Sequence, residues 1–314
     1  MKKFREDIEM RKLEVSVQTA RWFDETKPEE SMKFIKECGF EGVDYNINSL
    51  FQFSFDEEKL TSFFDKSLEE IYEYYVPLKD AAKENGISFS QAHALFPPYH
   101  QGGGRDALND YLLMVMEKMI AACGYLECPS IVIHPWIDWD NHDLAKEEEI
   151  NMSIYRHMIP FAKKYGVKIC LENMGVDSFS TDVTDTCRFI DALNKEAGED
   201  LFGYCLDIGH AKMTNKNLYR YIKALGKRLT VLHIHDNDGT KDAHLMPFTQ
   251  TNATGDALAI DWEGMLNGLK EIGYEGPLAF ETFVGITVIP KEMKKAALQY
   301  ICAAGKYMRD YISK

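Results

Sequence analysis

The sequence predicts a single (β/α)₈ barrel, and three observations lead to this prediction. Eight short apolar runs that are typical of buried strands recur along the chain. Amphipathic stretches with apolar residues three and four positions apart separate these runs, as in repeated βαβ units. The length of 314 residues is one that an eight-unit barrel often reaches as one domain. We therefore expect residues 1–314 to form one barrel domain, with residues 1–12 as an N-terminal extension.

Each predicted strand is a run rich in β-branched, aromatic or other apolar residues. In chain order the runs are Leu13–Gln18, Gly42–Ile47, Ile87–Ala94, Ser130–Pro135, Val167–Asn173, Gly203–Ile208, Leu229–His235 and Pro277–Thr282. Because helical patterns separate successive runs, parallel pairing is expected, and eight parallel strands close naturally into a barrel.

The expected helices begin and end with recognisable signals. The clearest helical patterns are Ser67–Asn85, Ala107–Cys123, Glu147–Tyr165 and Lys291–Tyr311. A glycine often stands between a helical pattern and the next strand, where a left-handed residue commonly stops a helix. We therefore expect C-caps at Gly39, Gly86, Gly124, Gly166 and Gly273.

Composition narrows the classes of function. The chain is 45% hydrophobic and 27% charged, as in a soluble globular protein, and no stretch approaches the length of a membrane span. The formal charge of −14 and a pI near 5.2 disfavour non-specific binding to nucleic acids and to anionic membranes. The start of the chain lacks the apolar run of a secretory signal.

The seven cysteines are odd in number, contain no CxxC pair and mostly lie within apolar patterns. A disulfide framework would have an even number at regular spacing. We expect buried free thiols and a cytoplasmic protein, because the cytoplasm keeps thiols reduced.

Polar side chains mark the carboxyl ends of most predicted strands, which is where barrels build their active sites. They are His93, His134, Glu172, Asp207, His210, His233, His235 and Glu281, with His244 in the loop after the seventh strand. A single strand-end histidine is usually a core or loop residue, and a single carboxylate often caps a helix. A set from six consecutive strands, all at one end, indicates chemistry.

Three of these residues are carboxylates on otherwise apolar strands: Glu172 in ICLEN, Asp207 in CLDIGH and Glu281 in AFET. Burying a carboxylate is costly unless it is paired or bound to a metal. Three carboxylates that converge would repel one another, and a divalent cation resolves that repulsion. Three carboxylates with one imidazole suit manganese, magnesium, zinc or cobalt.

Other motifs carry less information. The glycine run at residues 102–104 follows no strand directly and opens no phosphate-binding fingerprint. The tryptophans Trp22, Trp136 and Trp139 fall in loops expected at the catalytic end. They could form an apolar wall against a sugar, or they could pack between loops.

These motifs resemble the xylose isomerase-like barrel superfamily, which includes sugar isomerases, ketohexose epimerases, inosose dehydratases and the endonuclease IV enzymes. The likeness covers most of the chain and rests on IVIHPW, CLENMG, CLDIGH, HIHDNDG, the DAH of KDAHL, GDALAIDW and PLAFET. It implies one divalent cation bound by Glu172, Asp207, a histidine of the seventh strand and Glu281. It also places His210 beside them, in contact with substrate or a further metal.

The histidine of the seventh strand is ambiguous. HIHD fits the family's His-x-x-Asp pattern from His233, whereas HDND fits it from His235. We favour His233, because that register also places Asp236 and Asn237 on the family's Asp-Asn pair. His235 is the alternative ligand, one pleat further along the same inward face.

The resemblance implies a metal-dependent isomerase or epimerase in carbohydrate metabolism. In such enzymes the metal polarises a sugar carbonyl and thereby acidifies the neighbouring C–H. Glu172 and Glu281 are then the general base and general acid, with His210 as a further catalytic residue. The expected partner is a sugar or polyol, phosphorylated or free.

Two alternatives remain open. A lyase or dehydratase that acts on a cyclitol or glycoside would use the same metal and base, with Trp136, Trp139 and Phe248 around a bulky substrate group. An abasic-site nuclease with three zincs would place further metal ligands at His93, His134, Asp242 and His244. The chain argues against the nuclease, because QTARWF replaces a glycine- and serine-rich DNA loop and no basic stripe appears. The resemblance to the family also implies a homo-oligomer.

Overall fold

The computed structural model describes residues 12–51, 61–250 and 260–314. The N-terminal extension expected at residues 1–12 therefore lies outside the described residues except for Lys12, and so does the GDALA part of the GDALAIDW motif. None of the described helices is both long and apolar enough to cross a membrane.

The described residues form eight parallel strands, in which consecutive strands from β1 to β7 are neighbours and β8 pairs with β1. The strands are β1 (Val15–Gln18), β2 (Gly42–Tyr45), β3 (Ser88–His93), β4 (Ser130–Ile133), β5 (Lys168–Glu172), β6 (Phe202–Asp207), β7 (Leu229–His233) and β8 (Leu278–Phe280). Ile234 joins the two ends of this sheet through a bridge to Phe280. The architecture is thus an almost closed TIM barrel in one domain, which confirms the predicted fold.

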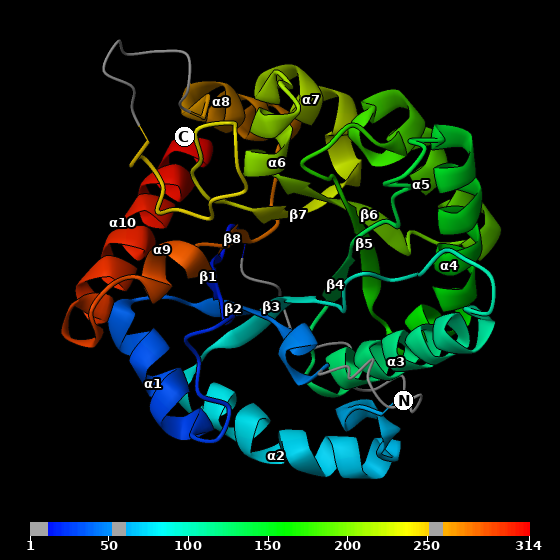
Figure 1. Ribbon diagram of the computed structural model, residues 1–314. Coiled ribbons are helices and arrows are strands. Elements are labelled where there is room, and N and C mark those ends of the chain that lie inside the picture. Colours follow the sequence, from blue (N-terminus) through cyan, green and yellow to red (C-terminus); the bar gives the residue numbers. More distant parts are fainter. Residues whose placement is uncertain (1–11, 52–60, 251–259) are drawn as a thin grey trace.

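Helices surround the strands, as Figure 1 shows. They are α1 (Pro28–Cys38), α2 (Leu68–Asn85), α3 (Asp106–Tyr125), α4 (Leu144–Tyr165), α5 (Val183–Ala197), α6 (Ile208–Met213), α7 (Leu218–Leu225), α8 (Trp262–Ile272), α9 (Phe283–Thr287) and α10 (Lys294–Ile312). Short 3₁₀ helices lie at Ile47–Leu50, Phe63–Asp65, Phe179–Thr181, Gly226–Arg228 and Lys291–Met293. The ring of helices is completed by α10, which packs against both α8 and α1 (Figure 1).

Helix ends follow the expected signals with one exception. Gly39, Gly86, Gly166 and Gly273 cap helices in the left-handed conformation, as predicted. The prediction for Gly124 was wrong, because this residue lies inside α3 and the helix ends at Tyr125. A side chain at this position would come within 2.9 Å of Cβ of Tyr165, so this glycine permits close packing against α4.

Two apolar regions form the core. The larger lies mostly between the strands and the surrounding helices. The smaller consists of Val132, Cys170, Cys205 and Val231. All seven cysteines are free thiols, and six of them are buried as predicted, but Cys187 is only partly buried.

Candidate metal centre

The carboxyl ends of β5 to β8 bring three carboxylates and one imidazole together. Glu172, Asp207 and His233 are the last residues of β5, β6 and β7, and Glu281 follows β8 directly. One ligand atom from each of the four lies within 4.8 Å of the others, and all four residues are buried. We call this set the central cluster. Its members are the four residues that the sequence predicts as metal ligands.

Histidines flank Glu172 on two sides. Its Oε1 lies 3.1 Å from Nδ1 of His233, and its Oε2 lies 2.8 Å from Nε2 of His134. Burial alone raises the pKa of Glu172, but the two imidazoles outweigh burial and hold this pKa well below its ordinary value. Glu172 is therefore an ionised carboxylate at neutral pH.

Asp207 caps the short helix α6 and also belongs to the central cluster. Its Oδ1 accepts a hydrogen bond from the backbone N–H of His210 at 2.6 Å, and both of its oxygens lie 3.1 Å from Nε2 of His235. The side-chain amide of Asn173 makes two hydrogen bonds of 2.8 Å to the backbone of Asp207. Burial raises the pKa of Asp207, whereas His210 and His235 lower it, to about 2.

The two histidines of HIHD occupy different surroundings. Nδ1 of His233 lies 3.1 Å from Oε1 of Glu172 and 3.3 Å from Oε2 of Glu281, so it faces the central cluster. Nε2 of His235 instead faces Asp207 and lies 3.6 Å from Oδ1 of Asp242. His233 therefore belongs to the central cluster and His235 does not, and the role of His233 as the metal ligand stays a prediction.

A first group of histidines lies beside Glu172. His93 is the last residue of β3, and His134 follows β4 directly. Their Nε2 atoms are 3.0 Å apart, and Nε2 of His93 lies 3.7 Å from Oε2 of Glu172. Burial and the neighbouring His134 lower the pKa of His93, so this imidazole is neutral at pH 7. Both residues thus lie where the sequence placed them, at the edge of the central cluster.

A second group surrounds Asp242 in the loop after β7. Oδ2 of Asp242 lies 2.8 Å from Nε2 of His244 and 3.2 Å from Nε2 of His210. Nδ1 of His210 lies 2.8 Å from the carbonyl oxygen of Asn173. Burial lowers the pKa of His244, but Glu281 and Asp242 outweigh burial and raise it to about 9. Ligand atoms of His235, Asp242 and His244 lie within 4.8 Å of one another, which makes them a second possible metal set.

The donor set of the central cluster fits a divalent cation. Three carboxylates and one imidazole converge in a buried place, and their ion-pair partners in the described ranges are histidines only. Carboxylates brought together without a strong cation repel one another and lose their hydration. Oxygen-rich sets with one imidazole bind hard or borderline divalent ions.

Four polar residues that contact the central cluster or its neighbours were missed from the sequence. Gln18 donates a hydrogen bond from Nε2 to Oε1 of Glu281, and Asp44 contacts His233. Gln18 and Asn173 are the last residues of the first and fifth predicted strands, so the criterion used for the other strands would have found them. Asp44 and Gln91 lie inside the second and third predicted strands, where that criterion does not apply.

The aromatic residues that the sequence places near the mouth have different surroundings in the structure. Trp136 is buried, with its backbone hydrogen-bonded to Asn151, so it mainly packs between elements. Trp139 is exposed. Phe248 packs against Trp262 of α8 and Tyr307 of α10 and does not contact the central cluster.

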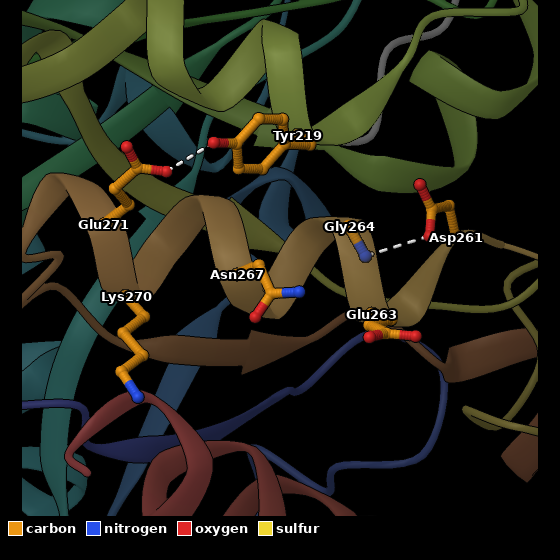
Figure 2. Close-up of a pocket in the computed structure, with 7 residues that line it drawn as sticks. All are labelled: Tyr219, Asp261, Glu263, Gly264, Asn267, Lys270 and Glu271. Atoms are coloured by element: carbon orange, nitrogen blue, oxygen red, sulfur yellow. Dashed lines mark hydrogen bonds between the residues drawn. The ribbon is translucent and has the colours of Figure 1, made fainter.

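A cavity of about 730 Å³ lies on the outer wall, between α7 and α8 (Figure 2). Its lining includes Tyr219, whose hydroxyl donates a hydrogen bond to Glu271, and Asp261, which caps α8. None of the residues in the central cluster lines this cavity. The cavity is therefore separate from the candidate metal centre.

Comparisons with known proteins identify a matching family. A family model described as a xylose isomerase-like TIM barrel matches residues 32–303. An uncharacterized protein of Sinorhizobium fredii is 23% identical in an alignment of length 278 that covers 83% of each chain. An inosose isomerase of Bacillus subtilis is 26% identical over 207 residues, which cover 65% of this chain and 69% of that one. Among solved structures, a 3-keto-D-glucoside 4-epimerase of E. coli has a TM-score of 0.67 at 17% identity, covering 93% of this chain and 100% of that one.

Proposed function

Because the chain belongs to the xylose isomerase-like TIM barrel family, we propose that it is a divalent-metal-dependent sugar isomerase or epimerase. Its reaction would move a proton at a carbon next to a carbonyl group of a sugar or polyol. The observation that carries this proposal is the central cluster, with ligand atoms of three carboxylates and one imidazole within 4.8 Å of one another. The names of two similar proteins, an inosose isomerase and a 3-keto-D-glucoside 4-epimerase, support the same class of reaction.

The metal ligands in this proposal are Glu172, Asp207, His233 and Glu281. When bound, a divalent cation supplies Lewis acidity that makes a C–H bond beside a coordinated carbonyl more acidic. The described oxygen-rich set is compatible with manganese, magnesium, zinc or cobalt, and we take manganese as the first ion to test.

Glu172 and Glu281 would carry the proton. They come from strands three positions apart in the barrel, and each has a carboxylate oxygen close to Nδ1 of His233, at 3.1 and 3.3 Å. The lowered pKa of Glu172, whose burial is outweighed by His134 and His233, keeps it ionised and able to accept a proton. Return of the proton to the opposite face of the same carbon gives epimerisation, whereas its transfer to the neighbouring carbon gives isomerisation.

His210 would orient the substrate. Its Nδ1 lies 2.8 Å from the carbonyl oxygen of Asn173, so the ring orientation is set by the backbone after β5. Its Nε2 lies 3.2 Å from Asp242 at the rim of the barrel. A hydroxyl or carbonyl oxygen of a sugar that reached this rim could hydrogen-bond to His210 in place of Asp242.

The experiment that tests this proposal combines metal content with proton exchange. The purified chain is analysed by elemental mass spectrometry and is then incubated in D₂O with ketohexoses, inososes and 3-keto-glucosides. About one divalent ion per chain, together with deuterium incorporation beside the carbonyl, is the expected result. A chain that binds no divalent ion and exchanges no proton would contradict the proposal.

Two other activities are distinguished by the same experiment. A lyase or dehydratase on a cyclitol or glycoside would release water or an aglycone, and mass spectrometry would detect the unsaturated product. A three-zinc abasic-site nuclease is favoured by one observation, namely the two histidine-rich groups beside the central cluster. Two or three zincs per chain would favour that alternative, against which the formal charge of −14 argues.

We further propose a cytoplasmic setting and a homo-oligomer. Seven free thiols without a disulfide fit a reducing compartment. Light scattering of the purified chain measures the oligomeric state directly.

A further inference from the structure

Asp44 is a fully buried carboxylate inside the barrel, in strand β2. Its Oδ2 lies 3.1 Å from Nε2 of His233 and accepts a hydrogen bond of 3.1 Å from Nε2 of Gln91. In the described parts of the chain, Asp44 forms no ion pair with a lysine or arginine. An ionised carboxylate at such a position requires a specific partner, because burial without one is costly. The imidazole of His233 is that partner.

The two nitrogens of His233 face different groups. Nδ1 faces the carboxylates of Glu172 and Glu281, whereas Nε2 faces Asp44. In the structure Nδ1 makes a hydrogen bond with Oε1 of Glu172, so Asp44 is the carboxylate that lies beside Nε2. A cation that takes the lone pair of Nδ1 leaves the ring proton on Nε2, where the carboxylate of Asp44 can accept it in a hydrogen bond. The lone pair of Nδ1 then points at the central cluster, as a metal ligand requires.

An irregularity in the sheet places Gln91 beside Asp44. The register between β2 and β3 shifts after Val43, so that Val43 pairs with Phe89 but Asp44 pairs with Gln91. Ser90 is the extra residue, and its hydroxyl donates a hydrogen bond of 2.9 Å to the carbonyl of Val43. Bulges of this kind redirect side chains next to active sites.

Two further contacts restrain the arrangement. Nε2 of Gln91 also lies 3.3 Å from the carbonyl oxygen of Leu232, the residue before His233, and so links Asp44 to β7. The ring of His93 stacks on that of His233, with centroids 5.5 Å apart and an angle of 15° between the planes. His93 thus restrains the face of the His233 ring, and Asp44 with Gln91 restrains its edge.

We propose that Asp44, supported by Gln91, is a positioning residue that holds the ring of His233 through Nε2 and thereby strengthens binding of the divalent cation. This inference rests on the metal site of the proposed function. It assigns a role to a strand, β2, that contributes no residue to the central cluster.

The test compares Asp44→Val, Asp44→Asn and Ser16→Ala in the full-length chain. Valine removes the acceptor at nearly constant volume, whereas asparagine keeps an oxygen acceptor and removes the charge. Ser16 is a matched control, because it is a buried polar residue of the neighbouring strand β1 whose partner across the sheet is Gly42. Circular dichroism and thermal unfolding establish that each variant is folded.

Two readouts are taken without any substrate. Nitrogen-15 NMR of histidine-labelled protein loaded with Zn²⁺ reports the hydrogen bond of Nε2–H of His233, assigned by the loss of its signals in His233→Gln. Calorimetric titration with Mn²⁺ reports affinity. We expect Asp44→Val to shift the Nε2–H signals and to give an affinity about 10- to 100-fold lower, as for other groups that hydrogen-bond to a metal ligand. We expect a smaller loss for Asp44→Asn and none for Ser16→Ala.

Folded Asp44 variants with the wild-type Nε2–H signals and wild-type Mn²⁺ affinity would overturn the inference. If valine does not fold, the asparagine variant decides, since loss of the charge alone should shift both readouts. Failure of the proposed function looks different, because the wild-type chain itself would then bind no divalent ion. That result would overturn the inference together with the proposed function, whereas a metal-binding wild type with unaffected variants overturns the inference alone.

Discussion

The inward faces of β4 to β7 carry two layers of opposite character. The lower layer is Val132, Cys170, Cys205 and Val231, which form an apolar cluster of their own. The upper layer lies two residues further along the same strands and consists of His134, Glu172, Asp207 and His233. Side chains two positions apart share a face and are separated by about 7 Å. Within that distance the barrel changes from apolar to ionisable.

This difference separates stability from chemistry. The apolar layer excludes water from below and lowers the local dielectric constant, which strengthens every interaction between the upper layer and a cation. It also offers no hydrogen bond to the carboxylates above it, which leaves them dependent on histidines and a metal. Changes in the upper layer should therefore alter metal binding and proton transfer, whereas changes in the lower layer should alter only the free energy of unfolding.

The largest effect is expected for the two glutamates of the central cluster. Glu172→Gln and Glu281→Gln should each lower the rate of proton exchange by about 100- to 10,000-fold, because glutamine cannot accept or deliver the proton. Proton NMR of the sugar in D₂O measures this rate, and circular dichroism should show an unchanged barrel. A variant whose exchange stays within about tenfold of wild type would remove that glutamate from the acid–base pair.

The next effect distinguishes the two histidines after β7. His233→Ala should lower Mn²⁺ affinity by about 100-fold or more, because it removes a ligand of the central cluster, whereas His235→Ala should lower it by about tenfold at most. Calorimetric titration gives both values under the same conditions. The reverse order would move the metal ligand from His233 to His235 and would make the chosen register wrong.

A smaller effect is expected from the apolar layer. Val132→Ala removes two methyl groups from a fully buried side chain and should lower the free energy of unfolding by about 1 to 3 kcal/mol. Denaturation in urea measures this change, and Mn²⁺ affinity should stay at the wild-type level. A loss of affinity as large as that of His233→Ala would mean that the two layers are not independent.

The smallest effect is expected on the outer wall, far from both layers. Arg228 donates two hydrogen bonds of 2.7 Å to Asp191, and this interaction lowers the pKa of Asp191 below its ordinary value. Because the folded state has the lower pKa, the pair stabilises the fold above the unfolded-state pKa and loses this contribution as the pH falls through the folded-state pKa. Both side chains are substantially exposed, so solvent screens the pair.

Asp191→Asn should therefore lower the free energy of unfolding by less than about 1 kcal/mol at neutral pH. The difference from wild type should shrink as the pH falls below about 4. Urea denaturation across this pH range provides the check, and a difference that grows in acid would contradict the assignment. Proton exchange and metal affinity should not change.

Much of the fold could be predicted from the sequence because strand and helix patterns are local. Every predicted strand is present, although β1 begins at Val15 instead of Leu13 and β8 is reduced to Leu278–Phe280. Strand ends depend on hydrogen bonds to neighbouring strands, which no local pattern specifies. The predicted C-cap at Gly124 was wrong for a similar reason, since the role of this glycine depends on Tyr165 of another helix.

Those residues of the candidate site that lie at strand ends could be predicted from the sequence. Glu172, Asp207, His233 and Glu281 could be named because the carboxyl ends of barrel strands meet at one mouth. Asp44 and Gln91 could not be connected to them, because their effect depends on a one-residue shift between β2 and β3. Such a shift has no signature in the residues themselves.

The sequence by itself determined the eight βα units, the single domain and the ionisable residues that each strand carries to its carboxyl end. These follow from hydrophobic periodicity and from alternation along a strand, which are properties of neighbouring residues. Only the tertiary structure decided which nitrogen of His233 faces the central cluster, which histidine belongs to that cluster, and that Asp44 lies behind His233. These depend on contacts between residues far apart in the chain, and closure of the barrel is what brings those residues together.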